Sequence, residues 1–162
     1  MQGVPAWLSS LPGLLILTTV AVSPLCGQTA RPGCTTTVTA RERTLQAQSF
    51  ATEKLWIWQQ KMNLGDWKIS VVVAPIGDLR PDTVGNVHWD LREKTAVIRI
   101  LDPADYKLPF QAMLRDIEFT VVHELIHVEI APIVGNLDRS PASHVEEERT
   151  ANSVAGALLA SQ

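Results

Sequence analysis

The sequence predicts an α+β fold in which one long helix precedes a small sheet and two more helices follow it. The first observation is that residues 41–63 contain neither proline nor glycine. The second is that three β-rich runs come next and end by residue 101. The third is that two stretches with helical character occupy most of the remaining chain. We therefore expect a sheet of three or four strands, including a hairpin, between an N-terminal helix and two C-terminal helices.

The bulk composition is that of one globular domain without an electrostatic site for polyanions. The chain has 162 residues, of which 46% are hydrophobic and 19% are charged, so it can bury a sizeable core. Its formal net charge is -3, and it has no run of basic residues. We expect no nucleic-acid partner and no binding to an anionic membrane.

Residues 1–40 are expected to form a leader and linker, and residues 41–162 the folded domain. The apolar core Leu14–Val22 has the length of a signal-peptide h-region but is too short to span a bilayer. The segment ahead of it contains neither lysine nor arginine, so we favour a cytoplasmic protein over a secreted one. The two cysteines, Cys26 and Cys34, lack the spacing of a zinc or redox motif. Any metal site must therefore use nitrogen and oxygen ligands.

The first helix is predicted over Arg41–Asn63, with Gly65 as its stop signal. Spacings of three, four or seven residues indicate the helix and connect Leu45, Thr52, Leu55, Trp56 and Met62. A strand follows at Trp67–Val73, where side chains alternate with period two. Two further runs, Val87–Leu91 and Thr95–Leu101, flank a charged turn and predict the hairpin.

The two C-terminal helices are predicted from about residue 111 to 130 and from about residue 141 or 144 to 160. The former is apolar nearly all round. The start of the latter has two interpretations. Ser143 and Glu146 form a capping-box pattern, whereas Ser140 followed by Pro141 favours a start one turn earlier.

The first of these helices carries the pattern His-Glu-X-X-His at residues 123–127. Residues four apart lie about 40° from one another round a helix, so His123 and His127 project from one face and can bind one ion. Glu124 lies about 100° round from His123 and can reach a metal-bound water as a general base. The flanking residues are apolar, so these three side chains are expected to be partly buried and to need a partner. We therefore predict a metal site, with zinc as the metal.

The third ligand must come from another part of the chain. A motif extended to a third histidine would need Gly at position 130 and His at position 133, where this chain has Ile130 and Ile133. The richest source of ligands is the start of the last helix, which contains His144, Glu146, Glu147 and Glu148.

Glu148 is the preferred third ligand, with Glu147 as the alternative. Glu146 is engaged elsewhere if Ser143 caps the helix. Asn152 lies one turn after Glu148 on the same side, where it can hold a liganding histidine through its other ring nitrogen.

The stretch VVHELIH followed by EERTAN resembles the gluzincin class of zinc metallopeptidases, most closely the minimal versions called minigluzincins. The order of helix, strand, hairpin, motif helix and glutamate helix is similar to their catalytic core over about residues 41–160. The resemblance implies a zincin-like fold, Glu124 as general base, and the zinc ligands His123, His127 and Glu148. It also implies that an extended substrate adds to the strand nearest the motif helix, expected to be Thr95–Leu101. The chain departs from the pattern at Asn152, where many relatives carry an acid.

Hydrolysis of a peptide also needs a donor for the oxyanion besides the metal. His144 lies about one turn before Glu148 on the same helix face and is the expected catalytic donor. Tyr106 and His88 are weaker candidates.

The sequence thus predicts a zinc metalloendopeptidase that acts on a peptide or protein substrate. Two alternatives stay open. One is a regulatory metalloprotease that cleaves a single partner such as a repressor, and the other is a non-catalytic zinc-binding protein.

Overall fold

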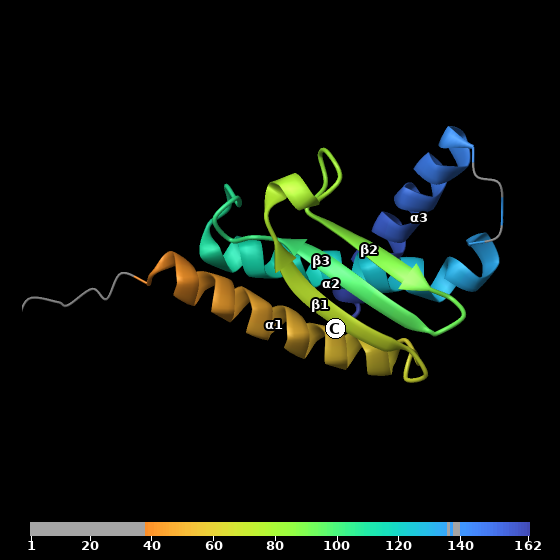
Figure 1. Cartoon of the computed structure of the whole chain (residues 1–162), viewed down its shortest axis with the longest axis horizontal. Coiled ribbons are helices and arrows are strands. Elements are labelled where there is room, and N and C mark those ends of the chain that lie inside the picture. Colours follow the sequence, from red (N-terminus) through yellow and green to blue (C-terminus); the bar gives the residue numbers. More distant parts are fainter. Residues whose placement is uncertain (1–37, 136, 138–139) are drawn as a thin grey trace, which may run out of the picture. The chain divides into compact units, whose positions relative to one another are not determined.

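The computed structural model describes residues 38–135, 137 and 140–162 of the chain. The predictions for the leader, including its h-region and both cysteines, lie outside these residues. The described elements are α1 (Ala40–Lys61), β1 (Lys68–Ala74), the 3₁₀ helix η1 (Ile76–Asp78), β2 (Gly85–Asp90), β3 (Thr95–Leu101), α2 (Phe110–Val134) and α3 (Pro141–Ala160) (Figure 1). The predicted α+β fold with a small sheet and a hairpin is confirmed.

Helix α1 lies close to its predicted limits, and its buried face includes part of the spacing pattern. Thr39 caps its start, because the Thr39 hydroxyl accepts a hydrogen bond from the Glu42 N–H at 3.2 Å. The fully buried side chains are Ala47, Ala51, Leu55 and Trp58. Of the residues in the spacing pattern, Leu55 is buried, whereas Leu45 and Trp56 are 59% and 67% exposed. Helix α1 also packs through two alanines, which allow a close approach to the core.

The three strands form one mixed sheet in the order β1-β3-β2. Strand β1 is parallel to β3, and β2 is antiparallel to it. Because β3 is central, both of its edges are paired, and the expectation that it accepts an extended substrate is wrong. The outer strand that contacts α2 is β2.

The outer edge of β1 is covered by α1, which runs beside it (Figure 1). The side-chain amide of Gln48 donates to the Val71 carbonyl oxygen at 2.7 Å, and its own oxygen accepts from the Val73 N–H at 3.0 Å. Gln48 therefore pairs with the β1 backbone as a neighbouring strand would. Of the two sheet edges, this one is closed to further strand pairing.

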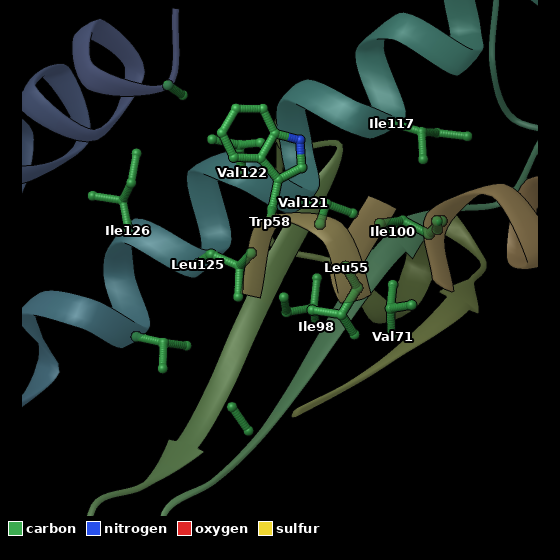
Figure 2. Close-up of a cluster of buried hydrophobic side chains, with 14 of the residues drawn as sticks. Leu55, Trp58, Val71, Ile98, Ile100, Ile117, Val121, Val122, Leu125 and Ile126 are labelled. Atoms are coloured by element: carbon green, nitrogen blue, oxygen red, sulfur yellow. The ribbon is translucent and has the colours of Figure 1, made fainter. Parts of the chain in front are cut away.

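Helices α1 and α2 share one core with the sheet (Figure 2). Strand residues alternate as predicted, since Val71 is 5% and Val72 is 39% exposed. Figure 2 shows Ile98 and Ile100 of β3 among apolar side chains from both helices. The packing holds α2 in place along its length.

Helix α3 begins at the earlier of its two predicted starts. The Ser140 hydroxyl accepts a hydrogen bond from the Ser143 N–H at 3.1 Å, and Pro141 occupies the first turn. The alternative capping box from Ser143 to Glu146 is not formed, and Glu146 instead pairs with Arg149 at 2.6 Å. In the described part of the chain, none of the helices combines the length and apolarity that crossing a bilayer requires.

Candidate metal centre

The structure brings the three predicted ligand residues together from two helices. Nε2 of His123 lies 3.0 Å from Nε2 of His127 and 3.2 Å from Oε2 of Glu148. Nε2 of His127 lies 3.5 Å from Oε1 of Glu148. The two histidines come from consecutive turns of α2, and the glutamate reaches them from α3. These three side chains form a group that can hold one metal ion.

The two histidines are largely buried because α2 is apolar on nearly every side. The His127 side chain is 6% exposed and the His123 side chain 12%, whereas Glu148 is 37% exposed. Burial lowers the pKa of His123, and the neighbouring His127 lowers it further, although Glu148 and Asn152 act in the opposite direction. Burial thus favours neutral His123, which is the form that binds a metal ion.

Glu147, the alternative third ligand, lies on the far side of His127. Its Oε1 is 3.0 Å from Nδ1 of His127, and its side chain is only 7% exposed. The carboxylate therefore faces the ring nitrogen that points away from the ligand group. The group with the geometry to hold an ion contains Glu148 and not Glu147.

Glu124 is buried beside the ligand group, with 6% of the residue exposed. Burial raises its pKa to about 8, the charge of Glu148 contributes in the same direction, and Arg80 opposes both. A carboxylate whose pKa lies near neutral pH is suited to accept and return a proton. Glu124 thus has the surroundings of the predicted general base.

The start of β2 lies against α2 at this point, and Gly85 makes the close approach possible. A Cβ atom at Gly85 would lie 2.3 Å from Cγ2 of Thr120 and 3.4 Å from Oε1 of Glu124. A side chain at this position would displace Thr120 or push β2 away from α2. Strand β2 and helix α2 are therefore held at a fixed separation.

We compared the chain with protein-family models, curated proteins and solved structures. No family model, curated protein or solved structure matches it. We therefore infer a function from the geometry of the site and from its motifs.

A cleft of about 470 Å³ opens over the ligand group. Its walls include the start of β2 and the loop before it, Phe119 on α2, and the α3 residues that face α2. Pockets of this size accept small molecules or a few residues of a peptide. The cleft gives a substrate access to the ligand group and to Glu124.

The structure separates the three predicted oxyanion donors. His144 lines the cleft and its Nε2 lies 3.8 Å from Oε1 of Glu148. Tyr106 does not line the cleft; it is partly buried, and burial together with the nearby Asp116 raises its pKa. His88 is exposed and does not line the cleft. Of the three, only His144 is placed to contact a substrate there.

Sequence reasoning missed one cation at the site, Arg80. This residue lies in the loop between η1 and β2, lines the cleft, and acts electrostatically on Glu124. The loop has no periodic pattern, so only its place directly before the outer strand could have indicated it. Arg80 gives the cleft a second donor besides His144 for a negatively charged oxygen.

Proposed function

We propose that this protein is a zinc-dependent peptidase that hydrolyses peptide bonds. The observation that carries the proposal is the convergence of His123, His127 and Glu148 beside the buried carboxyl group of Glu124 in one cleft. Two imidazoles and one carboxylate with an open position are a common ligand set of hydrolytic zinc sites. The resemblance of the two helical motifs to gluzincins supports the same function.

The separations of the ligand atoms support zinc as the metal. Zinc bonds to nitrogen and oxygen are about 2.0–2.1 Å long, so two ligands of a tetrahedral ion lie about 3.3 Å apart. The two histidine nitrogens are 3.0 Å apart, Oε2 of Glu148 is 3.2 Å from Nε2 of His123, and the other carboxylate oxygen, Oε1, is 3.5 Å from Nε2 of His127. These separations are close to the spacing of a tetrahedral site. The donor set, which contains no sulfur, also suits zinc.

The chain's own residues supply the remaining chemistry. When bound, zinc supplies a Lewis acid that polarises the substrate carbonyl and lowers the pKa of a water molecule. Glu124 accepts a proton from the attacking water, whose oxygen forms a bond to the carbonyl carbon. Glu124 then returns the proton to the amide nitrogen as the C–N bond breaks. His144 and Arg80 line the cleft and can donate to the carbonyl oxygen as it becomes negatively charged.

An extended substrate has one strand to pair with. Strand β2 borders the cleft through Gly85, Asn86, Val87 and Trp89. It pairs only with β3 in the described sheet, so its other edge is open. A peptide that adds to this edge would pass over the ligand group, and its backbone would be recognised independently of most of its side chains.

The experiment that tests the proposal combines metal analysis with a peptide digest. Purified protein is loaded with zinc and dialysed, and its zinc content is compared with that of Glu148→Gln and of Glu146→Gln. Glu146 is the matched control, because it is exposed and pairs with Arg149. We expect about one zinc ion per chain in the wild type and the control, and much less in Glu148→Gln.

The same samples are then incubated with a mixed peptide library, and products are identified by mass spectrometry. We expect cleavage by the wild type and by Glu146→Gln only. Bound zinc without any cleavage would favour the non-catalytic alternative. Cleavage that persists after zinc is removed would contradict the proposal.

A further inference from the structure

We propose that Glu147 is a positioning residue that holds His127 by its outer ring nitrogen, so that the opposite nitrogen faces the metal. The inference rests on the proposed metal site and assigns a separate role to the glutamate next to the ligand. In this role Glu147, which lines the cleft, does not itself bind zinc. Its effect passes through the imidazole of His127.

The contact geometry supports this role. Glu147 Oε1 lies 3.0 Å from Nδ1 of His127, which is within hydrogen-bonding distance. On the other side of the ring, Glu148 Oε1 lies 3.5 Å from Nε2. Two consecutive residues of α3 therefore contact the two nitrogens of one imidazole. This arrangement is possible because neighbouring helix positions diverge by about 100° and the ring stands between them.

A carboxylate has one way to bond with that nitrogen. An ionised carboxylate only accepts hydrogen bonds, so Nδ1 must carry the hydrogen and donate it to Glu147. Nε2 is then left with its lone pair directed toward His123 and Glu148. A histidine that binds a metal through one nitrogen usually donates from the other to a carboxylate or a carbonyl oxygen, which fixes the tautomer and ring orientation.

Burial makes the contact more than an incidental surface pair. The side chains of His127 and Glu147 are 6% and 7% exposed, whereas those of Glu146 and Arg149 are 63% and 70% exposed. Charged contacts at exposed positions contribute little, because water competes for both groups. A buried carboxylate requires a partner, and the ring N–H of His127 provides one.

The two histidines are supported unequally. Nδ1 of His123 is buried and finds no hydrogen-bond partner among the described residues. Asn152 contributes to the surroundings of His123, but an amide is a weaker acceptor than a carboxylate. We infer that His127 is the better oriented ligand, and that Glu147 is the reason.

The experiment compares Glu147→Gln and Glu147→Ala with Glu146→Gln, which changes the adjacent exposed glutamate. The first readout is the tautomer of His127 in the metal-free protein, obtained from long-range ¹H–¹⁵N NMR correlations of ¹⁵N-labelled samples. We expect Nδ1–H in the wild type and in Glu146→Gln. We expect a mixture of tautomers or Nε2–H in Glu147→Ala. This readout requires neither bound zinc nor catalysis.

The second readout is zinc affinity, measured by competition with a chromogenic chelator. We expect a 10- to 100-fold weaker affinity in Glu147→Ala, as is usual when the support of a liganding histidine is lost. Glu147→Gln keeps an acceptor oxygen and the shape of the side chain, so a smaller loss is expected. It also serves as the test if Glu147→Ala does not fold.

The outcomes separate this inference from the proposed function. Wild-type protein with Nε2–H at His127, or a tautomer unchanged in Glu147→Ala and in Glu147→Gln, would overturn the positioning role. Loss of bound zinc in both Glu147 variants at saturating zinc, with zinc retained in Glu148→Gln, would make Glu147 a ligand instead. If the wild type binds no zinc but the tautomer responds as expected, the proposed function fails and the role of Glu147 toward His127 stands.

Discussion

Helices α2 and α3 both carry parts of the candidate metal centre, but the protein holds them very differently. Most of α2 from Thr120 to Val128 is buried, including His127 and Glu124. In α3 only Ala151 and Ala155 are fully buried, while Val145 and Val154 are 64% and 40% exposed. Apolar packing therefore fixes α2, whereas α3 depends more on the contacts of its glutamates with the histidines. The site joins a rigid half to a weakly held half.

The burial of Glu124 in α2 makes the stability of the protein depend on pH, and a pH series can measure this dependence. Burial raises the pKa of Glu124 to about 8, from 4.5 for a free side chain, so the metal-free folded chain binds this proton more tightly than the unfolded chain. The contribution of the Glu124 carboxyl group to the free energy of unfolding is complete below about pH 4.5 and is lost as the pH rises through about 8. We expect the free energy of unfolding of metal-free protein to fall over this window, by on the order of a few kcal/mol.

Glu124→Gln removes the charge and keeps the shape, so it should be more stable than the wild type at pH 8 to 9 and nearly equal to it at pH 4.5. Urea titrations of both metal-free proteins at several pH values measure the difference. Parallel pH profiles for the two would mean that the Glu124 carboxyl group is not held in a low-dielectric environment.

Amide exchange in α3, the weakly held half of the site, should increase more than in α2 when the metal is removed. Zinc at a hundredfold excess over its dissociation constant stabilises the bound state by about 2.7 kcal/mol. Since Glu148 joins α3 to the histidines of α2, we expect a chelator to speed amide exchange in α3 by about a hundredfold and to change α2 much less. Hydrogen exchange with and without EDTA, followed by mass spectrometry, measures both helices in one sample. An equal loss of protection in α2 and α3 would contradict the difference between them.

The packing of α3 through Ala155 can be disrupted directly by a larger side chain. Ala155 is 0% exposed, so extra methylene groups there must displace α3 or its neighbours. We expect Ala155→Leu to lower the free energy of unfolding by about 1–3 kcal/mol and to weaken zinc binding as Glu148 moves away from the histidines. Thermal unfolding and chelator competition test the two effects. A variant that is destabilised but binds zinc as the wild type does would show that α3 docking and metal binding are independent.

A matched change at the next position of α3, Gly156, should have the smallest effect and the opposite sign. A Cβ atom at Gly156 would contact nothing within 4 Å. Alanine is a better helix former than glycine, so we expect Gly156→Ala to stabilise the protein by about 0.5–1 kcal/mol without changing zinc affinity. Thermal unfolding measures the first and chelator competition the second. Destabilisation by Gly156→Ala would mean that this side of α3 is covered.

The same difference explains what could be predicted from the sequence. His123 and His127 lie one turn apart on an apolar helix, with Glu124 directly after His123, so their spacing alone predicted that they act together. Glu148 could be preferred over Glu147 only through a neighbour on its own helix, because the docking of α3 on α2 is a tertiary feature. Glu146 was set aside on the condition that Ser143 caps α3; the structure has the other predicted start, at Ser140, and Glu146 still lies outside the ligand group, paired with Arg149. The role of Glu147 was hidden because an imidazole has two nitrogens and therefore two sides to contact.

The sheet shows a similar limit. A hairpin pattern predicts that β2 and β3 are neighbours, but it does not say on which side of them β1 pairs. Because β1 joins β3, the free edge beside α2 belongs to β2. The spacing pattern in α1 does not show which face is buried, since the alanines at 47 and 51 carry no strong signal of hydrophobicity and matter through close packing.

The proposal that Glu124 and a zinc ion on α2 and α3 hydrolyse peptides is tested most directly by zinc-loaded wild type and Glu124→Gln side by side. Both are analysed for zinc content and then incubated with the same peptide library. We predict about one zinc ion per chain in both and cleavage that falls by about 10²-fold or more in Glu124→Gln. Wild-type protein that retains no zinc, or equal cleavage by the two proteins, would contradict the proposed function.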